Sequence, residues 1–192
     1  MDINKVLKKQ KKSYKRFMLS MGFIFIGLPI ALICSKINNP FFYLYLLIIE
    51  VLILESMMIR TNEEVLEFKQ IGSKVAIEVG VLHKKYTIIP NKIAIIHIIP
   101  TGKFFDILII SKSRFRNKRL KHVDFRFLSK QPIIDKYYNR IRKEDEDPYF
   151  YFVIKKGGIK KYMLLNYLYK TCVSAIFTDI TIEKIKEYRS QE

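Results

Sequence analysis

Hydrophobic and polar positions are distributed unevenly along this chain. Two long apolar runs occupy residues 17–35 and 41–59, and neither has a polar face. Each run has 19 residues, within the roughly 17–25 that an α-helix needs to cross a bilayer. Only residues 36–40 separate the runs, a length that suits a tight turn. The pattern therefore predicts a transmembrane helical hairpin of two helices, 17–35 and 41–59.

Basic residues orient this predicted hairpin. Residues 1–16 carry seven Lys or Arg and one acid, the turn carries Lys36, and Arg60 follows the second run. Because cations concentrate on the cytoplasmic side of membrane proteins, both termini are expected to be cytoplasmic, in a multi-pass protein of the cytoplasmic membrane. Residues 32–34 lack the small side chains of a signal-peptide cleavage site. The alternative is a pair of apolar helices buried inside a soluble protein.

Small side chains form one face of the first predicted helix. Gly27, Ala31 and Ser35 recur at intervals of four residues. This spacing lets another helix approach closely in a membrane. We therefore interpret these three residues as a candidate surface for a membrane partner.

Glu50 lies near the middle of the second apolar run. An ionised carboxylate at the centre of a bilayer costs about 2.5–3.5 kcal/mol, and neither run contains Lys or Arg to neutralise it. Glu50 is therefore protonated, hydrogen-bonded to a neighbour such as Ser20 or Tyr45, or bound to a partner subunit. Glu55 lies near the end of its run, where its side chain can reach the interface.

Residues 60–192 are expected to form one cytoplasmic domain. Short β-branched runs separated by turn residues predict an antiparallel meander. Residues 129–148 are predicted to be a linker that ends in four consecutive, solvated acids. A strand at 149–155 and two helices, 160–177 and 179–189, complete the domain, with Thr178 or Thr181 capping the last helix. The predicted strands before the linker are residues 65–69, 75–82, 85–89, 93–99, 104–111 and 119–128.

Part of this domain resembles a known family. Gly80-Val81-Leu82 precede the basic pair Lys84-Lys85, and an Ile-Pro-x-x-Ile strand start follows at 89–93. With two preceding apolar helices, this pattern is similar to the bacterial pleckstrin-homology-like (PH-like) membrane proteins over residues 60–128. The resemblance implies a bent antiparallel sheet or partial barrel closed by a C-terminal helix. It also implies a binding or scaffolding role and carries over no catalytic residues. Some members of the family are linked to resistance against membrane-active peptides, and others are accessory subunits of membrane assemblies.

The chain is strongly basic, with 35 Lys and Arg against 18 Asp and Glu in 192 residues. Six cations fall within ten residues around Phe115, and on an extended backbone the first three would project on the same side. Such a cluster can contact anionic lipid or nucleic-acid phosphates. Lipid is the preferred partner because the hairpin would hold the domain against the leaflet, and a merely solvated basic hairpin is the plainest alternative. The six cations are Lys112, Arg114, Arg116, Lys118, Arg119 and Lys121.

Catalytic chemistry is not evident in the sequence. It contains no Gly-x-Ser-x-Gly, no phosphate-binding glycine loop and no His-Glu-x-x-His. His83, His97 and His122 are not at zinc-ligand spacing and are expected in turns or on strand surfaces. Cys34 and Cys172 would be separated by the membrane topology and are expected to remain thiols. We therefore predict no enzyme, no metal and no cofactor.

Together these features predict an α+β membrane protein, with an N-terminal transmembrane hairpin and an antiparallel PH-like domain that ends in helices. The expected function is that of a non-enzymatic scaffold or accessory subunit of a bacterial membrane complex. Its expected partners are other membrane subunits or a second copy of the chain, together with anionic lipids. Two alternatives are an immunity factor against membrane-active peptides and a conjugation or secretion-channel component that contacts nucleic acid. The sequence leaves the partner and the oligomeric state open.

Overall fold

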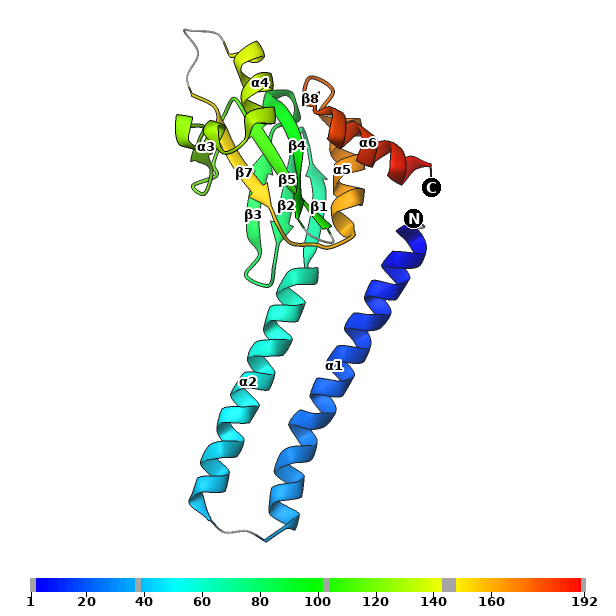
Figure 1. The fold of residues 1–192 in the computed structure, drawn as a ribbon, viewed down its shortest axis with the longest axis vertical. Helices are drawn as coiled ribbons and strands as arrows, with labels where there is room; N and C mark the ends of the chain where they lie inside the picture. The colour runs from blue at the N-terminus through cyan, green and yellow to red at the C-terminus, as the bar shows by residue number, and fades with distance from the viewer. Residues whose placement is uncertain (1–2, 37–38, 102–103, 143–147, 191–192) are drawn as a thin grey trace. The chain divides into compact units, whose positions relative to one another are not determined.

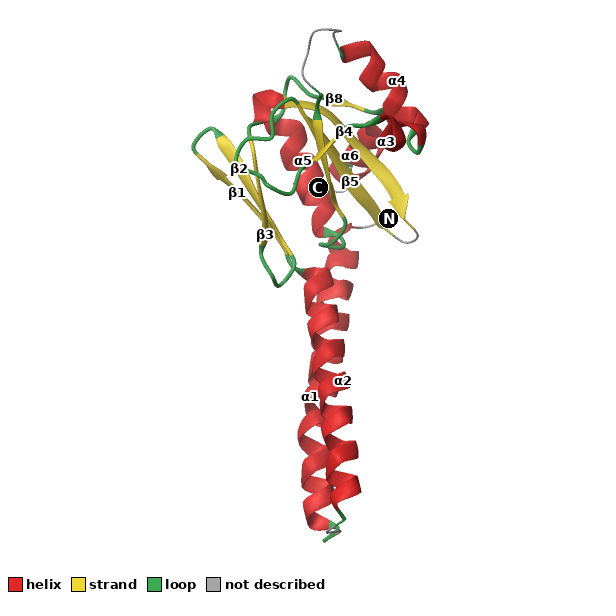
Figure 2. Ribbon diagram, turned by 90° about the vertical axis from the view of Figure 1, so that its left-hand side faces the viewer, coloured by secondary structure: helices red, strands yellow, loops and turns green. Residues whose placement is uncertain are grey.

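The computed structural model describes residues 3–36, 39–101, 104–142 and 148–190. The chain divides into two compact units, Met1–Glu64 and Val65–Glu192. The first unit is helical and the second contains the sheets (Figures 1 and 2). The fold class is therefore α+β, with two long apolar N-terminal helices, then antiparallel sheets and C-terminal helices.

The first unit is an antiparallel pair of helices, α1 (Ile3–Cys34) and α2 (Pro40–Glu64). Figure 1 shows them side by side, and Tyr14 of α1 lies 3.1 Å from Thr61 of α2 between hydroxyl oxygens. Both are long and apolar enough to cross a membrane by length and composition. Helix α1 begins well before the predicted residue 17 and ends one residue before the predicted 35, whereas α2 extends beyond the predicted 41–59 at both ends. The N-terminal segment predicted as residues 1–16 is, from Ile3 onward, the beginning of α1, because lysine is a good helix former.

The second unit begins with a three-stranded antiparallel meander, as the turn residues predicted. Its strands are β1 (Leu66–Ile71), β2 (Lys74–Val79) and β3 (Lys84–Ile88). Leu66 pairs with Val79, and Val79 pairs with Lys84. The turn between β2 and β3 therefore lies at the end of the sheet where β1 begins, and the turn between β1 and β2 lies at the other end.

The second sheet has the order β6-β7-β5-β4-β8. Its neighbours are antiparallel except for β4 and β8, which are parallel. A simple meander is therefore wrong for this sheet, because β7 inserts between β5 and β6 and β8 returns to β4 from near the C-terminus. The strands are β4 (Ile93–Thr101), β5 (Phe104–Ser111), β6 (Lys121–His122), β7 (Phe150–Ile154) and β8 (Ile176–Phe177), with a 3-10 turn, η1 (Pro90–Lys92), before β4.

Two helices occupy positions where the sequence predicted a strand and a linker. The strand expected at 119–128 is wrong beyond the two residues of β6, because α3 (Phe125–Ser129) follows, with the Asp124 carboxylate accepting a hydrogen bond from the Phe127 amide. The linker expected at 129–148 contains α4 (Pro132–Ile141), which begins with proline, a residue suited to the first helical turn. The acidic residues 144–147 lie outside the described residues.

The C-terminal helices also differ from their predicted bounds. Helix α5 (Lys160–Thr171) ends six residues before the predicted 177, because residues 176–177 form β8 instead. Helix α6 (Asp179–Arg189) coincides with the predicted 179–189. Its capping residue is Thr178, but neither the Thr178 nor the Thr181 hydroxyl caps it; the two hydroxyl oxygens instead lie 2.8 Å apart.

The core of the second unit lies against the second sheet. Ile95, Leu108 and Ile110 contribute fully buried side chains from β4 and β5, and Ile134 and Tyr138 of α4 pack on them. Helix α5 contacts both β1 and β5, one strand from each sheet. Its buried leucines therefore join the two sheets.

Candidate functional site

The basic loop (residues 112–121) connects β5 to β6 in a compact, irregular conformation. Phe115 has a φ of +44°, so the extended backbone expected for the first three cations is wrong. All six cations of the loop are exposed. They lie in one stretch of ten residues, so the loop presents a concentrated positive charge to its surroundings.

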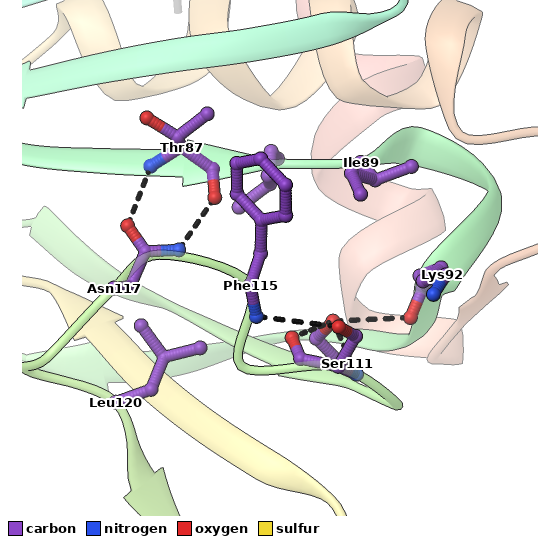
Figure 3. A pocket seen from close by; sticks show the side chains of 9 residues that line it. Thr87, Ile89, Lys92, Ser111, Phe115, Asn117 and Leu120 are labelled. Atoms are coloured by element: carbon purple, nitrogen blue, oxygen red, sulfur yellow. Dashed lines mark hydrogen bonds between the residues drawn. The ribbon is translucent and has the colours of Figure 1, made fainter.

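Asn117 holds this loop against the first sheet. Its side-chain oxygen accepts a hydrogen bond from the Thr87 amide at 2.8 Å, and its side-chain nitrogen donates to the Thr87 carbonyl at 2.5 Å (Figure 3). The amide thus pairs with the edge of β3 as a neighbouring strand would. Asn117 is only 8% exposed, and sequence reasoning missed it because a single Asn in a basic run resembles an ordinary turn residue.

Arg114 contributes to the loop's internal structure. Its guanidinium donates from Nε to the Asn117 carbonyl at 3.1 Å and from Nη2 to the Lys118 carbonyl at 2.8 Å. The Phe115 ring lies 4.5 Å from the Lys74 ammonium and 6.0 Å from the Arg116 guanidinium. Arg114 is therefore partly committed to holding the loop, while Arg116, Lys118 and their neighbours present charge outward.

The space beneath the basic loop is small. It measures about 210 Å³ including open solvent, and it has no room for a water molecule. Ser111 at its base donates to the Lys92 carbonyl at 3.1 Å, and Phe115, Asn117 and Leu120 close the other side (Figure 3). The arrangement therefore suits contact with a charged surface and does not suit enclosure of a small molecule.

Glu50 is shielded within the helical hairpin. Both carboxyl oxygens are buried and have no hydrogen-bond partner among the described residues. Neither Ser20 nor Tyr45 bonds to it, so the hydrogen bond considered from the sequence is absent.

The small-residue face (Gly27, Ala31 and Ser35) does not contact α2. A Cβ added at Gly27 would meet nothing within 4 Å, and Ala31 and Ser35 are exposed. Ser35 lies just beyond α1, where its hydroxyl donates to the Leu32 carbonyl at 2.7 Å. Within the described residues, the space beside Gly27 is therefore open to another helix.

A buried hydrogen-bond network joins α6 to β4. His97 Nδ1 lies 2.9 Å from the Thr178 hydroxyl, and the Ile98 amide donates to the Thr181 hydroxyl at 3.2 Å. His97 is 2% exposed, so its expected place on a strand surface is wrong. Burial lowers the pKa of the His97 imidazole, because the charged form loses its hydration. These groups dock the C-terminal helix.

Lys161 makes a second buried polar contact. Its ammonium donates to the Lys155 carbonyl at 2.8 Å and to the Asp106 carboxylate at 3.4 Å. Burial lowers the pKa of Lys161, although the nearby Asp106 charge opposes that shift. The ammonium therefore ties the start of α5 to the preceding connection and to β5.

Metal-ligand groups are not clustered in the part of the chain that the structure describes: no three His, Cys, Asp or Glu side chains converge there. Cys34 and Cys172 are both free thiols. Burial raises the pKa of the Cys172 thiol to about 11, which suppresses the reactive thiolate.

The site thus consists of an apolar hairpin with a shielded carboxyl group, joined in sequence to an α+β domain with an exposed basic loop. Comparison of the chain with protein-family models, curated proteins and solved structures found no match.

Proposed function

We propose that this protein is a non-enzymatic, membrane-anchored scaffold or accessory subunit of a bacterial membrane complex. The observation that carries the proposal is the surface of the apolar parts of α1 and α2, where large apolar side chains such as Phe23, Leu47 and Leu52 are exposed from Leu19 to Ile59. A continuous apolar surface of this kind is unfavourable in water and favourable in lipid. The hairpin then anchors the chain, with both termini in the cytoplasm.

Labelling of single cysteines tests this topology. In a Cys34→Ala background, Lys36→Cys is expected to react with a membrane-impermeant maleimide added to intact cells, because Lys36 is exposed at the hairpin tip. Val173→Cys, at a position 87% exposed in the second unit, is expected to react only after the membrane is permeabilised. Labelling of Val173→Cys in intact cells, or recovery of the protein without detergent, would contradict the proposal.

The second unit is proposed to be the PH-like binding module. Support comes from its two sheets and from α5, which contacts a strand of each. The absence of a water-sized space beneath the basic loop favours a protein partner or the anionic leaflet surface over a small ligand. In this proposal the six cations Lys112, Arg114, Arg116, Lys118, Arg119 and Lys121 supply the electrostatic contact.

The small-residue face and Glu50 are proposed to bind the membrane partner. Gly27 and Ala31 are open to a second helix, which could pack closely on them. Both Glu50 oxygens are buried and have no hydrogen-bond partner among the described residues, so a partner that supplies a donor reaches them only after the surrounding side chains rearrange.

Co-purification tests this partner surface. Glu50→Leu is expected to insert as well as the parent while recovering less of the partner in mild detergent, since a hydrogen-bonding group is lost. Gly27→Leu is expected to do the same by blocking close approach, whereas the matched control Ile26→Leu changes an exposed apolar side chain only. Unchanged recovery with both Glu50→Leu and Gly27→Leu would remove this surface from the proposal.

A further inference from the structure

The turn between β2 and β3 has an unusual composition. This apolar turn (residues 80–83) places Val81 and Leu82 at its tip, and Leu82 is 80% exposed. Tight turns are normally built from Gly, Asn, Asp, Ser or Pro. The other turn of the same sheet obeys that rule, because Gly72 and Ser73 connect β1 to β2. The exposed leucine is therefore a property of one end of the sheet.

The apolar turn is held beside the first residue of the domain. The Gly80 amide donates to the Val65 carbonyl at 2.9 Å, and Leu82 follows Gly80 by two residues, so it lies within about 10 Å of Val65. The turn at Gly72 and Ser73 lies at the other end of the strands, about 17 Å away at the rise of an extended chain. Of the two turns, the apolar one is thus nearer to the start of the domain.

The chain connects Val65 directly to the second apolar helix. The apolar run ends at Ile59 and α2 continues to Glu64, an extension of about 7.5 Å at the helical rise per residue. The headgroup layer on each side of a bilayer is about 5–8 Å thick. If α2 spans the membrane, Val65 leaves it at the outer edge of the headgroups, and Leu82 is within reach of that layer.

The charges next to the apolar turn suit the same environment. Glu78 lies 3.5 Å from the Lys85 ammonium and 3.6 Å from His83 Nδ1, so it offsets part of the local positive charge. Lys84 is exposed and has no ion-pair partner within the described residues. At a membrane surface the acyl chains lie next to the lipid phosphates. The exposed apolar tip suits the acyl chains, and the exposed Lys84 suits the phosphates.

We propose that the apolar turn inserts Leu82 and Val81 into the headgroup region of the cytoplasmic leaflet, with Lys84 on the lipid phosphates. This inference rests on the proposed membrane anchor, and it adds a second contact that restrains the orientation of the domain. If α2 spans the membrane, the direct link from Glu64 to Val65 keeps the apolar turn at a high effective concentration of lipid, so a small inserted surface contributes to binding. Lipid, and not a protein, is the partner that α2 brings to this position.

Fluorescence in proteoliposomes tests the insertion. The full chain carrying Cys34→Ala and His83→Cys is labelled with an environment-sensitive NBD fluorophore and reconstituted into vesicles of phosphatidylcholine and phosphatidylglycerol. We expect blue-shifted emission that spin-labelled lipids quench several-fold more strongly than the same label at Ser73→Cys. Leu82→Ser in the His83→Cys protein is expected to remove most of that quenching, whereas the equally exposed control Val173→Ser leaves it unchanged.

The outcomes separate this inference from the anchor itself. Protein that stays in the vesicle pellet at alkaline pH but gives equal, weak quenching at positions 83 and 73 would overturn the insertion and leave the anchor standing. Quenching that persists with Leu82→Ser would also overturn it, because the fluorophore alone would then be the inserting group. Protein that fails to remain with the vesicles would overturn both proposals.

Discussion

The helical hairpin and the sheet domain use the same apolar residue types in opposite ways. In the domain, Ile95 and Ile109 are fully buried between sheet and helices. In the hairpin, Ile53 is the one buried hydrophobic residue among those the structure describes, and leucines such as Leu52 are exposed. The difference teaches that a residue's hydrophobicity does not decide its burial. The surrounding solvent decides it, and two solvents act on one chain if the hairpin lies in lipid.

Buried polar groups follow the same division. In the domain, His97, Thr178 and Thr181 satisfy one another in a network that reaches the backbone of β4. In the hairpin, Glu50 is shielded and has no hydrogen-bond partner among the described residues. A domain that folds in water completes most of its own polar contacts, because an unsatisfied group opposes folding; among the described residues the buried Tyr138 hydroxyl is the exception. A hairpin that assembles with another chain can leave one open.

The largest expected effect contrasts two truncations of apolar side chains. Ile109→Ala creates a cavity in a closed core and should lower the free energy of unfolding by about 2–5 kcal/mol. Leu52→Ala removes a side chain that packs on no core, so its effect should be far smaller. Urea titration in mild detergent, followed by near-ultraviolet circular dichroism of the tyrosines, measures both. Equal losses would show that the hairpin surface is packed in the native protein and would break the comparison.

An intermediate effect concerns pH and the His97 network. Burial lowers the pKa of folded His97 below its ordinary value of 6.5, so below pH 6.5 the unfolded chain binds a proton that the folded chain does not. The free energy of unfolding should therefore fall as pH falls through this range, by up to about 1.4 kcal/mol per pH unit. His97→Gln should flatten this dependence in urea titrations at pH 5.5–7.5, whereas exposed His122→Gln should not. An unchanged slope in His97→Gln would assign the dependence to other groups.

The sequence predicts those features that depend on neighbouring residues. The hairpin follows from two uninterrupted apolar runs, and the strands from Val65 to Ser111 follow from turn residues such as Gly72 and Thr101. The continuation of α1 to Ile3 was missed because lysines interrupt the apolar pattern without disfavouring a helix. Pro132, which begins α4, was read as part of a linker.

Features that join distant segments could not be predicted in this way. Asn117 bonds to Thr87 across 30 positions, and His97 bonds to Thr178 across 81. No local pattern distinguishes these residues from turn or cap residues of the same type. The burial of the Glu50 carboxyl group likewise depends on tertiary packing, so the sequence identified the residue but not the surroundings of its oxygens.

The smallest expected effect concerns the Tyr138 hydroxyl and tests whether an unsatisfied polar group opposes folding of the domain. The Tyr138 hydroxyl is buried without a hydrogen-bond partner among the described residues, while its ring packs edge-on against Tyr149 at 5.4 Å between centroids. Tyr138→Phe keeps the ring and removes the hydroxyl, so it should raise the free energy of unfolding by about 1 kcal/mol. The adjacent Tyr137 donates to Asp179 at 3.0 Å, so Tyr137→Phe should lower it slightly. Both are measured by urea titration at one pH.

If Tyr138→Phe lowered the free energy of unfolding more than Tyr137→Phe, the Tyr138 hydroxyl would be hydrogen-bonded in solution, for example to a buried water. Among the described residues, the domain would then hold no unsatisfied buried side-chain polar group, and Glu50 alone would mark a contact left for another molecule. If Tyr138→Phe raises the free energy of unfolding, as expected, then the domain also contains an unfavourable buried group, at the place where α4 packs on the sheet. The hydroxyl of Tyr138 is neutral, so folding can tolerate its burial, whereas the charge that Glu50 would carry in water cannot remain in a bilayer without a proton or a partner.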